Sequence, residues 1–370
     1  MSLHLFTTRC LAVLIGAVTV SAKAQPELTV AQGLSIEVFA EVPNPRQMAM
    51  GKNGTLFVGT RRLGTVFALP KPGPTGKRTP IAIAKDLNMP AGVAIDSNGH
   101  LYIAATHEIK VIKNVENAMS NGHVSMTLLT DQLPNHNHHG WKHIKFSPEG
   151  QLVIPVGMPC NVCLPEHRFQ GTLQSLNLST GVWTTLATGV RNSIGFDWRA
   201  SSGRLWFSDN GRDWLGDDLP HDEINHIKTN GQHFGFPFFH GDQLPETDAD
   251  IAAKVPKGTQ FISPAVLIPA HSAPLGLHFY QGNQLPKRYK GALFAALHGS
   301  WNRSSPSGYL VNAYWFDAND QLIKQETVVE GFLSSAGKTM GRPVDFLEMS
   351  DGSLLISDDY GGRIWRLYAK

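Results

Sequence analysis

The sequence has little cysteine, little charge and only one long apolar run. Three cysteines in 370 residues are too few for a disulfide-stapled scaffold. Charged residues make up 17% of the chain and the formal net charge is +2, which excludes a strongly basic surface for nucleic acid or an anionic membrane. The apolar run lies at the N-terminus, and no later segment is long and apolar enough to cross a bilayer. The remaining composition is that of a turn-rich globular protein.

The N-terminus has the pattern of a secretory signal peptide. A basic Arg9 precedes an apolar stretch from Cys10 to Val20, and Ala22-Lys23-Ala24 fits an A-x-A cleavage site. We therefore expect residues 1–24 to be removed and residues 25–370 to form a single periplasmic or secreted domain. The stretch is too short to serve as an anchor, so no stable membrane insertion is expected. Loss of two basic residues and no acid brings the formal charge from +2 to zero.

The number and spacing of the cysteines are consistent with export. Cys10 leaves with the leader, so the mature chain keeps Cys160 and Cys163 in "PVGMPCNVCLPEHRF". Two nearby cysteines in an oxidising compartment predict one disulfide that pins a loop. A c-type haem site requires His directly after the second cysteine, where this chain has Leu164, and a zinc site requires a second pair of ligands.

The chain is organised by a repeat in which an apolar strand, a turn with glycine and a second apolar strand follow one another. The copies are RQMAMGKNGTLFVGT, AGVAIDSNGHLYIAA, KHIKFSPEGQLVIPVG, SIGFDWRASSGRLWFSDNG, PVDFLEMSDGSLLISDDYG and the diverged LGLHFYQGNQLPKRYKGALFAALHG. Their turn glycines are Gly54, Gly99, Gly150, Gly203, Gly291 and Gly352. The longest interval between them holds an insertion over residues 236–275. Six such units predict an all-β fold, a six-bladed β-propeller with four-stranded antiparallel blades and long loops at one end of the channel.

The segment "NHNHHGWKHIKFSPEG" places four histidines, His136, His138, His139 and His143, just ahead of the third turn. Their spacing leaves three interpretations open. They could form a zinc cage, one of them could be a catalytic base, or they could decorate an exposed loop.

Four motifs on the predicted loops and hairpins resemble those of the soluble quinoprotein glucose/sorbosone dehydrogenase family. They are H-x-x-x-x-x-x-F-S-P-E-G, G-V-R-N-S-x-G-F, D-E-I-N followed by F-G-F-P, and the closing S-D-D-Y-G-G-R-I-W-R-L. The resemblance covers roughly residues 30–368. It implies a six-bladed propeller that uses pyrroloquinoline quinone (PQQ) and calcium to oxidise a sugar of the aldose or sorbosone type.

The resemblance also implies catalytic roles. The family's base is a His seven residues before the apolar residue of the third hairpin, and seven residues before Phe146 is His139. A neutral imidazole suits removal of the hydroxyl proton while hydride passes to the quinone. Arg191 and Asn192 match the Arg-Asn pair that lies against the quinone and its reacting oxygen. This favours a base at His139 over a zinc cage.

The cofactor is an anionic tricarboxylate and requires cations. Arg342 matches the first Arg of the family's R-x-R-D, but the second Arg is replaced by Val344, and the family's cofactor-binding Lys aligns with His298. Arg303 lies on a loop inserted directly after His298, so we expect Arg303 to supply the missing charge.

Calcium is expected on oxygens of the acidic loop and the segment after it. In the family, the Glu of D-E-x-N and a carbonyl of an aromatic residue bind one calcium ion; these positions are Glu223 and Phe234. The carbonyls of Gly211 and Arg212 match the pair that holds the calcium bridging to the quinone.

Two rival functions remain at this stage. A calcium-dependent lactonase is also a six-bladed propeller with a His and a metal at the channel, but it has no need for a group of cations. A non-catalytic sugar-binding propeller has no need for a base next to a metal. The expected partners of the dehydrogenase are a small sugar and an electron acceptor, either a cytochrome or a quinone.

Overall fold

The computed structural model describes residues 25–72 and 76–370. The predicted signal peptide lies outside the described residues. Among the described residues, no helix is long and apolar enough to span a membrane.

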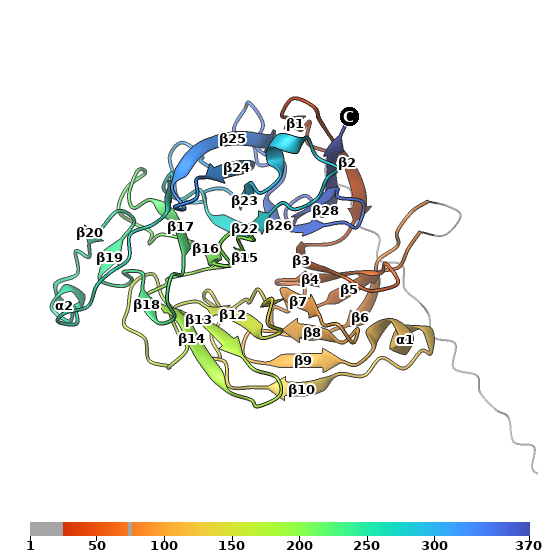
Figure 1. The fold of residues 1–370 in the computed structure, drawn as a ribbon, viewed down its shortest axis with the longest axis horizontal. Coiled ribbons are helices and arrows are strands. Elements are labelled where there is room, and N and C mark those ends of the chain that lie inside the picture. Colours follow the sequence, from red (N-terminus) through yellow and green to blue (C-terminus); the bar gives the residue numbers. More distant parts are fainter. Residues whose placement is uncertain (1–24, 73–75) are drawn as a thin grey trace, which may run out of the picture.

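Six antiparallel sheets stand in a ring around a central channel, so the predicted six-bladed propeller is confirmed (Figure 1). Within each blade, successive strands pair with their neighbours in sequence. The inner strands are β3 (Pro45–Met50), β7 (Gly92–Ile95), β11 (Lys145–Phe146), β15 (Phe196–Trp198), β22 (Pro274–Phe279) and β26 (Pro343–Glu348).

Three further strands complete each blade toward the outside. The second strands are β4 (Leu56–Thr60), β8 (Leu101–Ala104), β12 (Leu152–Val156), β16 (Leu205–Asp209), β23 (Leu293–Leu297) and β27 (Leu354–Asp358). The third strands are β5 (Val66–Leu69), β9 (Ile109–Ile112), β13 (Thr172–Leu176), β17 (Asp222–His226), β24 (Leu310–Phe316) and β28 (Arg363–Ala369). The outermost strands are β6 (Ile81–Ala84), β10 (Thr127–Thr130), β14 (Trp183–Thr188), β21 (Val266–Ile268), β25 (Leu322–Glu330) and β2 (Leu34–Glu41).

A few short elements lie outside the four strands of each blade. They are the added edge strands β1 (Thr29–Val30) and β18 (Gln232–His233), the hairpin β19 (Phe239–His240) and β20 (Leu244–Pro245), the helices α1 (Val115–Ser120) and α2 (Ala249–Ala252), and the 3₁₀ turn η1 (Lys287–Tyr289). The hairpin and α2 occupy the insertion predicted over residues 236–275.

The six predicted turn glycines each join an inner strand to a second strand. All six have positive φ, between 68° and 84°, a region that residues with a side chain rarely adopt. The repeat read from the sequence therefore corresponds to the inner hairpin of each blade.

The ring is closed by pairing the two ends of the described chain. The N-terminal β2 is the outermost strand of the blade that holds β26, β27 and β28, with Ile36 opposite Leu367. This arrangement gives the blade its fourth strand, which the hairpin repeat alone does not supply.

The core is divided among the interfaces between blades. One cluster of buried apolar side chains fills each of the six interfaces, because both faces of every blade are covered by neighbours. A seventh, smaller cluster joins Ile194, Leu275 and Val344, with Trp141 packed against it. These residues come from the inner segments of four consecutive blades, and we call their cluster the plug.

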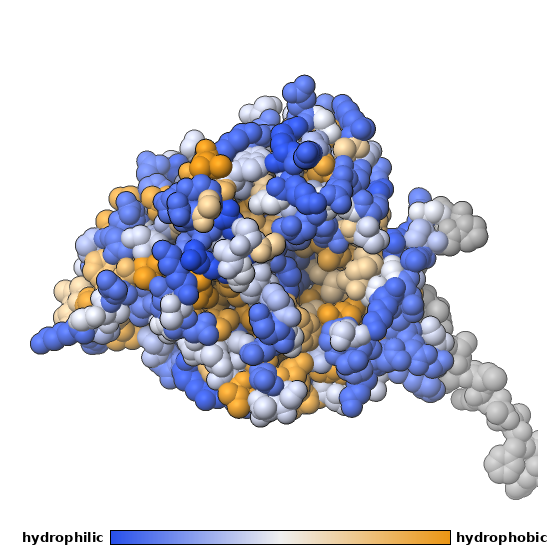
Figure 2. Space-filling view, in the orientation of Figure 1, coloured by the Kyte–Doolittle hydropathy of each residue, from blue (hydrophilic) through white to orange (hydrophobic). Residues whose placement is uncertain are grey.

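A cavity lies along the channel. It has a volume of about 360 Å³ and is lined by five of the inner strands and by the residues next to them. The face shown in Figure 2 is hollowed near its centre, where apolar residues are visible among hydrophilic ones.

Candidate active site

The predicted site residues gather at one end of the ring, which we call the mouth. In every blade the inner strand begins and the second strand ends at this end, because the two strands are antiparallel. The predicted residues are His139 before β11, Arg191 and Asn192 before β15, Gly211 and Arg212 after β16, Glu223 in β17, Phe234 after β18, His298 and Arg303 after β23, and Arg342 before β26.

His139 is buried in the mouth, and a backbone carbonyl holds its ring. The residue is 8% exposed, and its Nδ1 lies 2.9 Å from the carbonyl oxygen of Met158. Because a carbonyl only accepts, Nδ1 carries the proton and Nε2 carries the lone pair. Burial, followed by the positive charge of Arg191, lowers the pKa of His139 well below its ordinary value. The ring is therefore neutral at neutral pH, the form that accepts a proton.

The position of His139 depends on a glycine that the motifs did not single out. His139 has a φ of 49°, a strained value for a residue with a side chain. A Cβ placed on Gly157 would lie 2.7 Å from the Cβ of His139. Only a glycine at residue 157 leaves room for His139 in this conformation.

The other three histidines have different partners. The His138 ring packs on His139 with centroids 4.0 Å apart, and His136 Nδ1 lies 2.7 Å from the His138 carbonyl oxygen. His143 faces away from them, with its Nε2 3.2 Å from Gln47 Nε2. Over residues 25–72 and 76–370, no three His, Cys, Asp or Glu side chains form a group that could hold a metal. A zinc cage built from these histidines is therefore excluded.

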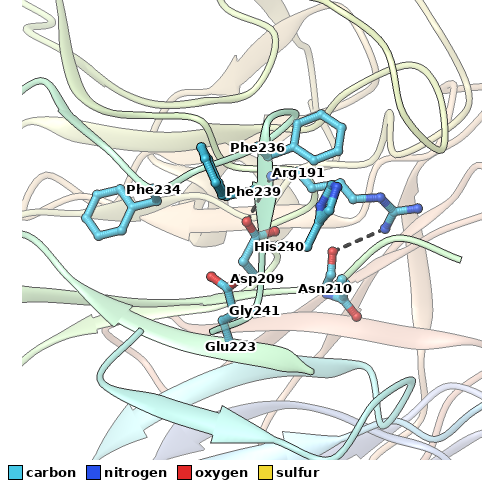
Figure 3. Close-up of a pocket in the computed structure, with 10 residues that line it drawn as sticks. Arg191, Asp209, Asn210, Glu223, Phe234, Phe236, Phe239, His240 and Gly241 are labelled. Carbon is cyan, nitrogen blue, oxygen red and sulfur yellow. Dashed lines mark hydrogen bonds between the residues drawn. The ribbon is translucent and has the colours of Figure 1, made fainter. Parts of the chain in front are cut away.

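Two buried carboxylates, Asp209 at the end of β16 and Glu223 in β17, face one small cavity (Figure 3). Its volume of about 10 Å³ is on the order of the space for one water molecule or ion. Burial raises the pKa of Asp209 to about 6. Burial, followed by repulsion from Asp209, raises the pKa of Glu223 well above its ordinary value. A cation in the cavity would stabilise both ionised carboxylates and offset the energetic cost of their burial and mutual repulsion.

Three of the four predicted metal ligands line this cavity, namely Gly211, Glu223 and Phe234. Arg212 is not among the lining residues, and its side chain pairs with Glu246 at 2.5 Å (Nη1 to Oε2). Two carboxylates with backbone carbonyls beside them form the oxygen-rich donor set that Ca²⁺ prefers.

Asn192 supplies another unpaired acceptor next to this site. Its backbone N–H donates to Asp209 Oδ1 at 2.6 Å. Its side-chain oxygen Oδ1 is buried and has no hydrogen-bond partner within the described part of the chain. A buried acceptor without a partner is costly, which fits a position that contacts a bound group.

Arg191 is held rather than free. Its Nε donates to the Asn161 carbonyl oxygen and its Nη2 to Asn161 Oδ1, both at 2.9 Å. Further bonds reach the Asn210 carbonyl oxygen (3.1 Å) and Asp213 Oδ2 (3.1 Å). Four of its donor contacts are thus made by the chain itself, and its predicted place against a quinone stays a prediction.

Asn161 owes its position to the cysteine pair. Cys160 and Cys163 are bonded to each other, as predicted, and Asn161 lies inside the small loop that they close. Asn161 Oδ1 also accepts from the backbone N–H of Asp213 at 2.8 Å. The disulfide therefore constrains the residue that orients Arg191.

A chain of contacts on another side of the mouth joins three arginines around one carboxylate. Arg342 Nη1 lies 3.4 Å from His298 Nδ1, and His298 Nε2 lies 2.9 Å from Asp359 Oδ1. The other oxygen of Asp359 accepts from Arg46 at 2.7 Å. Burial lowers the pKa of His298, and Arg61 lies close enough to Arg46 for the two charges to repel. Three guanidinium groups to one carboxylate leave this side of the mouth positive.

Of these three arginines, only Arg46 has an ion-pair partner among the described residues. Arg342 donates to the Gly299 carbonyl oxygen and to the Tyr309 hydroxyl, whereas the buried Nε of Arg61 has no hydrogen-bond partner there. Its guanidinium lies over the Trp141 ring, 3.5 Å from the centroid. Burial, followed by the charges of Arg46 and Arg62, lowers the pKa of Arg61 to about 9, so it remains charged at neutral pH. A half-buried, unpaired guanidinium is a place where an anion gains much on binding.

The plug explains why the family's second arginine is missing. Val344 is 2% exposed and packs against Ile194 and Leu275. A guanidinium at this position would be buried among apolar side chains at a high desolvation cost. The chain therefore cannot carry its second cation at residue 344.

Arg303, the expected substitute, is occupied elsewhere. Its Nη1 donates to the carbonyl oxygens of Asp217 and Ala270, and its Nη2 lies 3.1 Å from Asp218 Oδ1. These bonds tie the loop after β23 to the loop after β16. Contact between Arg303 and a cofactor carboxylate stays a prediction, and Arg61 has the more available guanidinium.

Sequence reasoning missed several residues of the mouth. They are Arg46, Arg61, Asn161, Asp209, Asp213 and Asp359. Asp359 lies in the closing S-D-D-Y-G-G-R-I-W-R-L motif and Asp213 in the acidic loop, but neither was given a role of its own. Most of the six residues follow a second strand of the repeat. A search of those positions for charged side chains would have found Arg61, Asp213 and Asp359.

Comparisons with known proteins identify the family of the chain. The sequence profile of the TrAA12-like family matches residues 28–370. An uncharacterized protein of Borreliella burgdorferi is 38% identical over 368 residues, covering 96% of this chain and 94% of that protein. A pyrroloquinoline quinone-dependent pyranose dehydrogenase of Coprinopsis cinerea is 46% identical over 123 residues, which cover 28% of this chain but 16% of that enzyme.

Solved structures share the fold at low identity. A Trichoderma reesei structure of carbohydrate-active enzyme family AA12 has a TM-score of 0.79 and 19% identity, over 96% of this chain and 100% of that one. The PQQ domain of the Coprinopsis cinerea pyranose dehydrogenase has a TM-score of 0.75 and 18% identity, over 94% and 98%. The soluble aldose sugar dehydrogenase of Escherichia coli has a TM-score of 0.66 and 18% identity, over 91% and 100%. The resemblance read from the motifs is confirmed, and the chain belongs to the TrAA12-like family.

Proposed function

We propose that this protein is a PQQ- and calcium-dependent dehydrogenase that oxidises a sugar of the aldose or sorbosone type. The observation that carries the proposal is the composition of the mouth. A neutral His139 lies within the electrostatic reach of Arg191 and Arg61. An acidic cavity suited to a cation and a group of unpaired positive charge suited to an anion share the same end of the ring.

The residues present fit both expected groups. Asp209 and Glu223, with carbonyls of Gly211 and Phe234, would hold calcium. Arg61, Arg46 and Arg342 would face the carboxylates of the cofactor, and the unpaired Oδ1 of Asn192 offers one further contact. A planar guanidinium is suited to a carboxylate because it donates two parallel hydrogen bonds. Bound PQQ would supply the quinone carbon that accepts hydride from the sugar.

The chain's own contribution to the reaction is proton removal and orientation. Nε2 of His139 takes the proton of the sugar hydroxyl, and the Met158 carbonyl keeps the ring in the tautomer that has its lone pair there. Arg191, fixed by Asn161 and Asp213, places permanent positive charge next to the base. That charge disfavours the imidazolium before reaction and stabilises negative charge that develops on a substrate oxygen.

The cations separate this proposal from its two rivals. A lactonase needs a metal and a base but no group of arginines, and a non-catalytic sugar-binding propeller needs no strained, neutral His beside a cation cavity. The leader pattern places the enzyme in the periplasm or outside the cell. Its electrons would pass to a cytochrome or quinone.

A turnover assay with an artificial electron acceptor tests the proposal. The protein is dialysed against chelator and assayed on a panel of aldoses with PQQ alone, Ca²⁺ alone, both, or neither. We expect activity with both together and a background rate in the other three mixtures. Equal activity without PQQ, or hydrolysis of a lactone by the same preparation, would contradict it.

A further inference from the structure

Two exposed tryptophans stand together at the mouth. Trp214, on the loop after β16, is 68% exposed, and Trp301, on the loop after β23, is 67% exposed. The other six tryptophans are buried or half-buried. The two indoles contact each other with centroids 5.5 Å apart and planes at 86°. Together they form a right-angled aromatic corner open to solvent.

The corner is rigid although it is exposed. Asn302 Nδ2 donates to Asp213 Oδ1 at 2.8 Å, which joins the residues next to the two indoles. Arg303 and Ser304 bond to Asp217 on the opposite loop, and His271 Nε2 lies 2.9 Å from the Gly216 carbonyl oxygen. Trp214 itself has a φ of 71°, a strained conformation for a bulky residue. Strain and solvent exposure at a pre-organised aromatic pair indicate a ligand.

The corner adjoins the proposed active site. Trp214 directly follows Asp213, whose Oδ2 lies 3.1 Å from Arg191 Nη2. The charge of Asp213 also acts on His138, the neighbour of the base. His139 is 8% exposed and lies deeper than the indoles. A ligand that contacts both would extend from the buried His139 to the exposed indoles.

The size of the corner favours a sugar over a protein. Two aromatic side chains present at most about 150–250 Å² each, whereas a stable protein partner buries about 800 Å² on each side. A pyranose ring has one apolar C–H face and an edge of hydroxyl groups, so it matches an aromatic face flanked by hydrogen-bonding groups. Asp213, Asp218 and Asn302 supply such groups around the indoles.

We infer that Trp214 and Trp301 form a subsite for the second ring of an oligosaccharide whose end ring reaches His139. The inference rests on the proposed sugar oxidation for the role of the end ring, but not for binding at the corner. The substrate class is thereby a chain of two or more pyranose units rather than a free monosaccharide.

Binding is tested first on the protein without cofactor, by calorimetric titration with cellotetraose, maltotetraose and glucose. We expect one of the tetraoses to bind at least several-fold more tightly than glucose. Trp214→Ala and Trp301→Ala should each weaken that binding roughly twofold to twelvefold, the equivalent of the 0.5–1.5 kcal/mol of an aromatic contact. Ile323→Ala, which removes an equally exposed side chain from β25, is the matched control and should bind as the wild type does.

Kinetics on the reconstituted enzyme give the second readout. The tryptophan variants should raise KM for the tetraose by the same factor, with kcat and the KM for glucose unchanged. Tetraose binding equal to glucose binding, or unchanged in both variants, would overturn the subsite. A defect seen only with a protein electron acceptor would also overturn it, because the corner would then dock that acceptor.

The two proposals fail separately. The protein could bind the tetraose through the two tryptophans and yet never oxidise sugar with PQQ. That result would contradict the proposed function but support the subsite. Sugar oxidation with no preference for the tetraose would do the reverse.

Discussion

At the scale of single residues, the site depends on where protons and charges are held. His139 is neutral because it is buried beside positive charge, and one carbonyl determines which ring nitrogen is free. The family resemblance pointed to His139 through its spacing from the third hairpin, which is a local signal, and its role as the base stays a prediction. Counting along the sequence could not find the group formed by Arg46, Arg61 and Asp359, since Arg46 and Asp359 are 313 positions apart in sequence.

His139→Ala should lower kcat by on the order of 10²- to 10⁴-fold, the usual cost of a lost general base, while PQQ binding stays near normal. In the wild type, a base with a lowered pKa loses activity only when the pH falls below that lowered value, so the acid limb of kcat/KM should lie well below pH 6.5. Steady-state kinetics between pH 4 and 8 measure both effects. His136→Ala is the control. A large loss in His136→Ala or His138→Ala but not in His139→Ala would show that another histidine is the base.

Arg61→Ala should weaken PQQ binding by about 1.5–3 kcal/mol, the range for a hydrogen bond to a charged group, because Arg61 forms no ion pair with any residue that the structure describes. The neighbouring Arg62 is exposed and provides the matched control Arg62→Ala. Fluorescence titration of the apo-variants with PQQ gives the affinities. If Arg303→Ala weakens binding and Arg61→Ala does not, the compensating cation is the one on the inserted loop.

At the scale of elements, the inner hairpin of each blade could be predicted from the sequence, but its contacts with the inner strands of other blades could not. A glycine turn between two apolar strands is a local signal, and all six predicted turns hold. Contacts between inner strands of different blades depend on the closure of the ring. His278 in β22 shows this: its Nδ1 lies 3.2 Å from Asp197 Oδ2 of β15, and its Nε2 lies 3.0 Å from Glu348 Oε2 of β26. It links three blades along the channel.

Burial alone lowers the pKa of His278, but its bonds to Asp197 and Glu348 outweigh burial and raise the pKa above the ordinary value. The stabilisation by the imidazolium is therefore complete below about pH 6.5 and is lost as the pH rises through the raised value. His278→Gln should lower the free energy of unfolding by about 1.5–3 kcal/mol at pH 5.5 and by less at pH 9. Urea titrations at the two pH values measure the difference. An equal loss at both would mean that His278 acts by packing and not by charge.

At the scale of the whole molecule, the propeller places an acidic cavity and a group of arginines at the same end of its ring. The plug of Ile194, Leu275 and Val344 joins the inner segments of consecutive blades at the mouth. The fold class and the blade number follow from the repeat, but the closing role of β2 does not, because its partner β28 is at the other end of the chain.

Calcium should stabilise the whole ring by relieving the buried carboxylates of Asp209 and Glu223, which come from β16 and β17 of one blade. A hundredfold excess of Ca²⁺ over its dissociation constant corresponds to about 2.7 kcal/mol. Thermal unfolding with Ca²⁺ and with chelator should therefore differ by several degrees, with Mg²⁺ less effective because it demands a tighter octahedral shell. Glu223→Gln should abolish the calcium shift. The same melting temperature in calcium and chelator would mean that the cavity does not bind calcium.

The central claim is that a sugar reduces a quinone bound at the mouth and that His139 removes the proton. The most direct test is anaerobic stopped-flow absorption of the protein reconstituted with PQQ and Ca²⁺, mixed with aldose or tetraose in the absence of any acceptor. We predict that the spectrum of the bound quinone changes to that of its reduced form in the wild type, in a single turnover. In His139→Ala, PQQ should bind with near-normal affinity and its reduction should be slower by on the order of 10²- to 10⁴-fold. A bound quinone that no sugar reduces, or reduction at the wild-type rate in His139→Ala, would contradict the claim.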